Sequence, residues 1–432
     1  MTVYHLHAVP HLTTALTGPL LELERHLLQR QSSIEAWFRE GWLATPAPFY
    51  ASVDVRNAGF KVAPVDTNLF PGGFNNLNPD FRVLCVQAVQ SAIEHAYPYA
   101  RRVLLIPESN TRNLNYMESV AVLAEIIRMA GFEVRLGSMS ETLATGLDLQ
   151  LPSGRSLKLE PLQRTGGRLC LGDGSPCLIL LNNDLSAGVP PILEGLEQPV
   201  IPRVEMGWWH RLKSRHFAHY HGAAVEFAEL VGIDPWLIEP LFRNCGEIDF
   251  MKREGEECLA SYIDELLDEI RDRYRAHGVD RRPFVVVKAD AGTYGMGIMT
   301  VFSASQVREL NRKQRTRMAS TKGGRAVHRV ILQEGVYTFE TWGTEQAVAE
   351  PVVYLIDHYV VGGFYRVHTK RGPDENLNSP GMHFEPLAFA GACNTPSPDM
   401  APDAHPNRFY TYGAIARLAL LAAAREQADV SP

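Results

Sequence analysis

The stretch FVVVKADAGTYGMGIMTVF, residues 284–302, tells more about the fold than any other part of the sequence. Two apolar runs flank three glycines, Gly292, Gly295 and Gly297, and Lys288 ends the first run. This pattern predicts a β-hairpin with a flexible tip. The stretch lacks G-x-x-x-x-G-K-[ST] and no helix pattern follows at once, so a P-loop and a Rossmann turn are excluded. A glycine tip can cover phosphates while Lys288 supplies charge, although a hairpin with a surface lysine would have the same sequence.

Two later stretches carry residues suited to a nucleotide. Residues 329–336, RVILQEGV, form an apolar strand that ends in a polar pair and a glycine, where a base could find a backbone donor and acceptor. Residues 360–381, VVGGFYRVHTKRGPDENLNSPG, place Arg366 and Lys370 on or just beyond a strand, before an Asn/Gly/Pro loop. Guanidinium groups suit the charge of a transferred phosphoryl group, and such loops suit carboxylates.

The residues before the hairpin predict a βαβ unit. RRVLLIPE (101–108), a helix over 116–131 that ends at Gly131, and the strand FEVRLGS give two parallel strands, and CLILLNND (177–184) gives a further strand of that sheet. PESNTRN (107–113) lies at the carboxyl end of the first strand, where open α/β sheets bind ligands. Helices are also expected over 17–43, 81–97, 257–277 and 409–426, and strands over 50–56, 60–66, 284–289, 298–302, 329–333, 348–356 and 358–367.

Charge and cysteine content exclude several classes of protein. The formal net charge of −7 argues against a general binder of nucleic acid or membrane surfaces. The start, MTVYHLHAVPHL, lacks a secretory pattern, and the apolar run 418–424 is too short to span a bilayer. Six scattered cysteines without a C-x-x-C pair predict reduced thiols. We expect a cytoplasmic protein that acts on small molecules, without nucleic-acid or membrane partners; homo-oligomerisation is left open.

The order of the segments over roughly residues 280–390 resembles the ATP-grasp fold. That order is strand, lysine, glycine hairpin, strand, basic helix, hinge strand ending in Gln-Glu-Gly-Val, arginine strand and Asn/Gly loop. The usual Glu-x-Asn metal strand near the C-terminus is missing. Upstream, PVDTN (64–68) offers Asp66 and Asn68 in acid-x-Asn spacing. Residues two apart on a strand face the same side, so both could hold one Mg²⁺ with ATP phosphates.

An acid-x-Asn motif before the glycine hairpin is the permuted order of eukaryotic-type glutathione synthetases. Over its whole length the chain is most similar to the proteobacterial type of glutamate–cysteine ligase, on VDTNLFPGGFNNLNPDF, IPESNTRN and VVKADAGTYGMGIM. The resemblance implies an α/β (α+β), ATP-grasp-like fold with a permuted motif order and an additional α/β substrate-binding subdomain. It places N-terminal helices and the metal and substrate strand–loop in 1–80, the substrate-binding subdomain in 81–205, and the ATP-grasp domain in 206–432, with its lid at about 284–335.

The resemblance also implies the reaction. ATP and Mg²⁺ would serve to join the γ-carboxylate of L-glutamate, through an acyl phosphate, to L-cysteine, giving γ-glutamylcysteine in the first step of glutathione biosynthesis. Positioning and charge neutralisation would dominate catalysis. Glutathione synthetase, another carboxylate–amine ligase and a non-catalytic ATP-grasp regulator stay open as alternatives.

The roles that the resemblance implies fall on specific residues. Arg366 and Lys288 would be catalytic, and ATP would be bound by Lys288, Gly292, Gly295, Gly297, Gln333, Glu334, Val336 and Glu350. Amino-acid substrates would be bound by Arg56, Arg112, Asn113, Lys370, Asn376 and Asn378, and the metal by Asp66, Asn68 and Asp290.

Each of these roles has a structural alternative. Residues 66–68 could form an Asx turn before the Pro-Gly-Gly loop. Arg56 and Arg112 could make surface ion pairs. Asp290 could cap the hairpin turn, and Glu350 could face solvent.

Two further motifs favour structural roles. RHFAHYH (215–221) has three histidines but no cysteine or carboxylate at matching spacing, so a structural or surface role is favoured over zinc binding. The run 308–329 has eight Lys or Arg against one Glu, which is typical of nucleic-acid binders. Within an ATP-grasp small domain, a solvated helix and a mobile loop explain this run better, and its charge could attract ATP.

Overall fold

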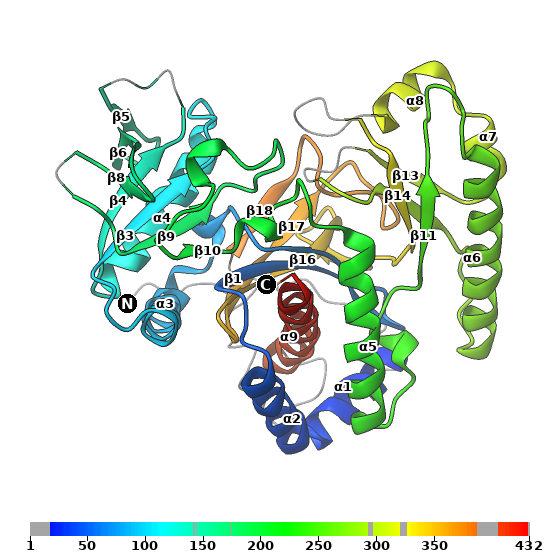
Figure 1. The fold of residues 1–432 in the computed structure, drawn as a ribbon. Coiled ribbons are helices and arrows are strands. Elements are labelled where there is room, and N and C mark those ends of the chain that lie inside the picture. Colours follow the sequence, from blue (N-terminus) through cyan, green and yellow to red (C-terminus); the bar gives the residue numbers. More distant parts are fainter. Residues whose placement is uncertain are drawn as a thin grey trace.

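The computed structural model describes residues 18–430 except 141, 142, 144, 173, 293–296, 320–325 and 387–404, and the side chains of 405–408 are also left out. In this part the chain forms three larger sheets and one two-stranded pair (Figure 1). The central sheet lies between a mainly parallel sheet on one side and a small antiparallel sheet on the other (Figure 1). The fold is therefore of the mixed α/β class, as predicted.

The central sheet joins strands from both ends of the chain. Its order is β18-β17-β16-β1-β2, with β15 beside β16, and all neighbours are antiparallel. Tyr50 lies opposite Ile356, so the first predicted strand pairs with a strand from the C-terminal half of the chain. The strands are β1 (Tyr50–Asn57), β2 (Val62–Asn68), β15 (Glu340–Trp342), β16 (Ala347–Ile356), β17 (Tyr359–His368) and β18 (His383–Glu385).

The second sheet contains the predicted βαβ unit. Its order is β10-β9-β3-β4-β6-β5, and only the β5–β6 pair of this sheet is antiparallel in the part described. Apolar faces of α3 and α4 pack with it in one core cluster. The elements are α3 (Arg82–Ala96), β3 (Arg102–Pro107), α4 (Leu114–Met129), β4 (Glu133–Ser138), β5 (Leu147–Gln150), β6 (Ser156–Pro161), β9 (Leu178–Asn182) and β10 (Val200–Ile201), with the pair β7 (Gln163–Thr165) and β8 (Arg168–Cys170) beside them.

The third sheet contains the glycine hairpin. Its order is β11-β14-β12-β13, and β12 and β13 pair antiparallel, which confirms the predicted hairpin. The apolar face of α6 covers this sheet, because Leu259, Ile263 and Leu266 share a buried cluster with its valines. The elements are β11 (Phe242–Glu247), α6 (Glu256–Ala276), β12 (Val285–Ala289), β13 (Ile298–Val301), α7 (Ser305–Arg308), α8 (Arg312–Met318) and β14 (Arg329–Glu334).

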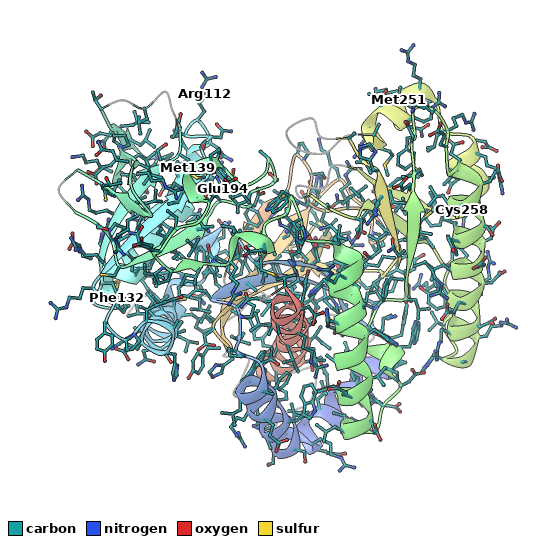
Figure 2. The ribbon with its side chains drawn as sticks, viewed as in Figure 1. Arg112, Phe132, Met139, Glu194, Met251 and Cys258 are labelled. Atoms are coloured by element: carbon teal, nitrogen blue, oxygen red, sulfur yellow. The ribbon has the colours of Figure 1, made fainter. Side chains whose placement is uncertain are left out.

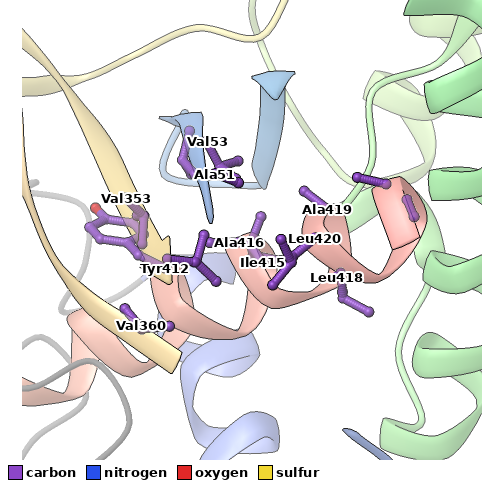
Figure 3. Close-up of a cluster of buried hydrophobic side chains, with 14 of the residues drawn as sticks. Ala51, Val53, Val353, Val360, Tyr412, Ile415, Ala416, Leu418, Ala419 and Leu420 are labelled. Carbon is purple, nitrogen blue, oxygen red and sulfur yellow. The ribbon is translucent and has the colours of Figure 1, made fainter. Parts of the chain in front are cut away.

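The far face of the central sheet is covered by the last helix, α9 (His405–Asp429). Figure 3 shows Ile415, Ala416 and Leu420 of α9 packed toward Ala51, Val53 and Val353 of β1 and β16. Its residues 414–424 are buried all round, since α1 (Pro19–Gln29), α2 (Gln31–Ala44) and α5 (Lys213–Val231) enclose it together with the sheet. The face of the sheet that packs on α9 is apolar, and the opposite face carries charged residues together with a second apolar cluster that includes Val352, Tyr354 and Phe364.

Most predicted elements are confirmed within a few residues, and one differs. The helix expected over 17–43 is two helices, α1 and α2, because the backbone at Arg30 leaves helical geometry, with φ −104° and ψ 9°. The turn lets Leu23 and Phe38 face the same core. No helix in the described residues has the length and apolar character needed to cross a bilayer.

Candidate active site

One face of the central sheet carries the charged residues. Arg366 on β17 lies opposite Glu350 on β16, and Asp54 on β1 lies opposite Asp66 on β2. Residues two apart on a strand face the same side, so Arg56 shares the face of Asp54. These five side chains come from two hairpins, β1–β2 and β16–β17, that are adjacent in the sheet but distant in sequence, and they line one pocket.

This first pocket, which is partly open to solvent, spans about 840 Å³ between the central and the small sheet. The small sheet and its surroundings contribute the apolar side chains of Val286, Ala289, Ile298 and Val336 beside polar ones such as Lys288 and Gln333, and the loop after β17 contributes polar ones. An apolar wall beside a charged face suits a ligand with one buried and one charged end. Besides the five residues above, the lining consists of Val65, Lys213, Val286, Lys288, Ala289, Gly292, Ile298, Thr300, Gln333, Glu334, Val336, Asp374, Glu375, Asn376 and Asn378.

Lys288 is the cation of the small sheet in this pocket. Its Nζ donates to the backbone oxygen of Val65 at 2.8 Å and to Oε1 of Gln333 at 2.6 Å. Burial lowers the pKa of Lys288 to about 8, although the nearby Asp66 carboxylate opposes this. The ammonium is therefore charged at neutral pH. Nε2 of Gln333 has no partner among the described residues, so this buried amide keeps a donor for a ligand.

Glu350 is held between two arginines. Nε of Arg56 donates to one of its oxygens at 2.9 Å, and Nη1 of Arg366 donates to the other at 2.6 Å. Arg366 also donates to both oxygens of Asp54, at 2.9 and 3.3 Å. Burial raises the pKa of Glu350, but the two guanidinium groups outweigh it and keep the pKa below its ordinary value. At 2% exposure Glu350 does not face solvent, so that alternative is wrong.

Arg56 ties two neighbouring segments to the sheet. Its Nη1 donates to the backbone oxygen of Val336 at 3.1 Å, and its Nη2 to that of Glu375 at 2.6 Å. The side chain is buried, so the alternative of a surface ion pair is wrong for Arg56. Because its donors contact the protein itself, this geometry favours positioning of the hinge and the loop over direct contact with a substrate.

Asp66 is paired with a lysine that the sequence did not single out. Nζ of Lys213 lies 3.1 Å from Oδ1 of Asp66 and 3.8 Å from the centre of the Trp208 ring. Burial raises the pKa of Asp66, but Lys213 and Lys288 outweigh it and lower the pKa to about 2. Asp66 is therefore ionised throughout the physiological range, as a metal ligand must be.

Asn68 and Asp290 make hydrogen bonds within the protein. Oδ1 of Asn68 accepts from the backbone N–H of Phe70 at 3.0 Å, which is the Asx turn considered as the alternative. The Asp290 oxygens accept from the backbone N–H and the hydroxyl of Ser214, both at 2.7 Å, at the start of α5. No group of three His, Cys, Asp or Glu suited to a metal ion occurs among the described residues. A metal here would have to share its ligands with phosphate oxygens.

The carboxylate of Glu334 anchors the end of β14, the predicted hinge strand, through hydrogen bonds. It accepts from Nζ of Lys61 at 2.9 Å, the backbone N–H of Leu241 at 3.0 Å and Nε1 of Trp236 at 3.1 Å. The Lys61 and Glu334 side chains are fully buried. Because its side chain is engaged in this way, Glu334 could contact a nucleotide base only through its backbone.

A second, larger pocket of about 1710 Å³ lies between the central and the parallel sheet. Four residues line both pockets, namely Asp54, Asp66, Arg366 and Asn378, so the two pockets meet there. We call these four residues the junction. One wall of the second pocket is polar and includes Asn75, Asn76, Glu108, Asn113, Asn115, Asn182 and Asp184; the other is apolar and includes Phe70, Val352, Tyr354, Phe364 and Phe384.

The remaining predicted site residues lie in different places. Asn113 lines the second pocket and also starts α4, where its Oδ1 accepts from the backbone of Tyr116 at 3.2 Å. Arg112 is exposed and extends away from the body of the protein (Figure 2). Lys370 is exposed as well, and neither is among the described residues lining the two pockets.

The glycine hairpin is described only at its two ends. Gly292 lines the first pocket with φ 103°, a backbone conformation that side-chain-bearing residues rarely adopt. Gly297 has φ 65°, and a Cβ there would lie 3.3 Å from that of Ala289. Gly295 lies outside the described residues.

The histidine motif and the basic run have separate surroundings. The three histidines contact three different partners: His216 contacts Thr67 at 2.9 Å, His219 contacts Asp429 at 2.9 Å, and His221 contacts Glu239 at 2.8 Å. This supports a structural role. Part of the basic run forms the helix α8, as predicted, and the loop that follows is outside the described residues.

Three site residues were missed at the sequence level. Asp54 had a usable signal, since it lies two residues before Arg56 on a predicted strand and must share its face. Lys213 and Trp208 had none, because only the tertiary fold brings the segment that contains them beside Asp66 on β2.

Comparisons with known proteins show the family to which the chain belongs. The family model described as glutamate-cysteine ligase matches residues 24–427. A crystal structure of a protein from Methylobacillus flagellatus KT, provisionally named a gamma-glutamylcysteine synthetase, is 60% identical, covers 98% of this chain and 99% of its own, and has a TM-score of 0.92. Curated proteins offer no match.

Two other solved structures are much less similar. A glutathione synthetase-like effector from Globodera pallida is 9% identical over 86% of this chain and 82% of its own, with a TM-score of 0.37. D-alanyl-alanine synthetase A from Vibrio cholerae is 8% identical over 74% of this chain and 81% of its own, with a TM-score of 0.33.

Proposed function

The chain belongs to the glutamate–cysteine ligase family, and on this premise we propose how its two joined pockets share the reaction. The enzyme joins L-glutamate to L-cysteine at the expense of ATP and gives γ-glutamylcysteine, the first step of glutathione biosynthesis. ATP takes the first pocket and the amino acids take the second. The observation that carries this division is that Asp54, Asp66, Arg366 and Asn378 line both pockets.

In the first pocket the base lies against the small sheet and the phosphates point to the junction. The backbone of residues 333–336 contacts the base, and the amide of Gln333 offers its unpaired donor. Lys288 and Lys213 face the phosphates from two sides, and the hairpin with Gly292 closes over them. Positive charge on both sides of the phosphates is what transfer of a phosphoryl group requires.

Asp66 and Asp54 fit a Mg²⁺ that is shared with these phosphates. They are cross-strand neighbours at the junction, and Asp66 is ionised. One or two carboxylates plus phosphate oxygens are the usual protein site for Mg²⁺. The ion would neutralise phosphate charge. Asp290 is left out of this set because it is fully buried against Ser214 and is not among the described residues that line the two pockets. Asn68 contributes at most through the turn that it makes.

The chemistry takes place at the junction. An oxygen of the glutamate γ-carboxylate attacks the terminal phosphorus of ATP, and ADP leaves. The free amine of cysteine then attacks the acyl carbon, the C–N bond forms, and phosphate leaves. Arg366 faces the transferred group, and its charge is secured by Asp54 and Glu350. The protein's part is to place the reactants and neutralise their charge.

Residues 81–205 act as the substrate-binding subdomain, because Glu108, Asn113, Asn182 and Asp184 give the second pocket its polar wall. Asn378, from the loop after β17, lines both pockets, and Asn376 of the same loop lines the first. Arg112 and Lys370 are not assigned to substrate, since both are exposed away from the pockets. The enzyme works in the cytoplasm, where ATP is supplied and cysteine is kept reduced.

The test is ADP release by the purified protein with ATP and Mg²⁺ and three sets of substrates. We expect turnover with L-glutamate plus L-cysteine, with γ-glutamylcysteine as product. Turnover that occurs only with γ-glutamylcysteine plus glycine would assign a glutathione synthetase instead. ATP binding without turnover in any set would support a non-catalytic regulator.

A further inference from the structure

The apolar wall of the second pocket begins directly beside the junction. Phe384 on β18 lies opposite Arg366, and Val352 on β16 lies opposite Asp54. Phe364 precedes Arg366 by two residues on β17 and so faces the same side, one strand step of about 6–7 Å away. Aromatic side chains therefore border the place where the new bond forms.

These aromatic residues form a connected surface. The rings of Tyr354 and Phe364 are 5.4 Å apart, and those of Phe364 and Phe384 are 4.8 Å apart in an edge-to-face arrangement. The Tyr354 hydroxyl donates to the backbone oxygen of Gly72, which fixes its ring. Tyr354 and Phe364 are almost fully buried, whereas Phe384 is half-buried at the rim. The surface is thus rigid at its base and accessible at its edge.

The acceptor amino acid must put its side chain close to this surface. Its amine has to reach the activated carbon at the junction, at about 3–3.5 Å. In an α-amino acid the first side-chain atom beyond Cβ lies only about 3–4 Å from that nitrogen, by ordinary bond lengths. Glutamate, in contrast, reaches the junction with the end of its side chain, and its α-carbon lies farther away, toward the polar wall.

Resting on the proposed function, we propose that Tyr354, Phe364 and Phe384 form the side-chain site of the acceptor and select cysteine over serine. A thiol is a small, weakly polar group that packs well against aromatic rings. A hydroxyl of the same position would lose its hydrogen bonds to water without gaining a partner on this wall. The polar residues of the opposite wall then serve the charged groups of the two amino acids.

The test compares acceptors in the wild type and in variants of Phe384, the most accessible of the three rings. The ratio of kcat/KM for L-cysteine to that for L-serine is expected at about 10–100 in the wild type, because an apolar site rejects an analogue that bears a hydroxyl only to this extent. We expect the wild-type enzyme to accept L-2-aminobutyrate, which has a methyl group in place of the thiol, as an acceptor in place of cysteine. Phe384→Ser should lower the cysteine-to-serine ratio about tenfold, and Phe384→Leu should retain most of it.

Controls separate this inference from the proposed function. KM for ATP and for L-glutamate should stay unchanged in both variants, and Val83→Ser on the outer surface of α3 should leave every constant unchanged. An unchanged ratio in a folded Phe384→Ser, or a rise in the KM of glutamate instead, overturns the inference while γ-glutamylcysteine synthesis stands. Failure of the wild type to use cysteine overturns the proposed function. Should Phe384→Ser not fold, Phe384→Ala and Phe384→Leu carry the same comparison.

Discussion

Nζ of Lys213 lies 3.1 Å from Oδ1 of Asp66 at the place where the two pockets meet. The lysine begins α5 and the aspartate belongs to β2, so this contact joins a helix to the charged face of the central sheet. It keeps Asp66 ionised and paired, with a pKa lowered to about 2. A metal ion that binds with ATP would take over this pairing and leave Lys213 to the phosphates.

Replacement of Asp66 tests the metal site. Asp66→Asn should raise the Mg²⁺ concentration for half-maximal rate about 10–100-fold, since it removes an ionised ligand and keeps the shape. The measurement is a Mg²⁺ titration of ADP release at saturating substrates. Asn68→Ala is the matched control, because Asn68 is engaged in the turn to Phe70, and its Mg²⁺ midpoint should not move. If the Mg²⁺ midpoint moved only in Asn68→Ala, Asn68 and not Asp66 would be the metal ligand.

The pKa of Lys288 predicts a pH dependence. Burial lowers this pKa to about 8, so the ammonium is charged below that pH and loses its proton as the pH rises through it. Because kcat/KM reports the free enzyme, kcat/KM for ATP should fall above about pH 8. In Lys288→Arg the charge persists, so the lower remaining activity should lack this decline. If kcat/KM fell with the same midpoint pH in the arginine variant, the decline would belong to a group other than Lys288.

Arg56 should act on ATP binding through the two segments that it holds. Arg56→Lys cannot keep the contacts to Glu350, Val336 and Glu375 together, so KM for ATP should rise about tenfold, the effect of losing a charged hydrogen bond or two. The KM values of the amino acids should stay constant. The opposite split, with KM for glutamate raised and that for ATP constant, would show that Arg56 binds a substrate carboxylate. Arg112→Lys, at an exposed arginine, serves as the control.

The Lys61–Glu334 pair predicts a stability effect. Both side chains are fully buried, so Lys61→Met leaves a carboxylate without its cation and should reduce the free energy of unfolding by about 3–5 kcal/mol. The double variant Lys61→Met with Glu334→Leu should recover part of this loss, because no buried charge then remains unpaired. Urea unfolding of the wild type, the single variant and the double variant measures these free energies of unfolding. A double variant less stable than Lys61→Met would contradict the explanation.

Local patterns in the sequence were sufficient for the parts of the fold that depend on local interactions. The hairpin of 284–302 was predictable because two apolar runs and three glycines leave few other conformations. The helix α6 was predictable because its apolar residues recur at helical spacing and pack on one sheet. The family resemblance, which rested on the order of such segments, is confirmed by the match over residues 24–427.

The sequence could not show which distant strands are neighbours. Nothing local indicates that Asp54 on β1 meets Arg366 on β17, yet their ion pair forms the junction. The same holds for Lys213, whose role depends on where α5 begins relative to β2. Arg112 is the reverse case, because its position in a plausible motif did not reveal that its side chain is exposed and extends away from the body of the protein (Figure 2).

The central claim is that the γ-carboxylate of glutamate is phosphorylated by ATP at the junction before cysteine attacks. The most direct test is the reaction of the wild-type protein with L-glutamate carrying ¹⁸O in both γ-carboxylate oxygens, followed by mass spectrometry of the phosphate released. Transfer through an acyl phosphate should leave one ¹⁸O in each phosphate and one in each γ-glutamylcysteine. Phosphate without ¹⁸O, at normal product formation, would contradict it.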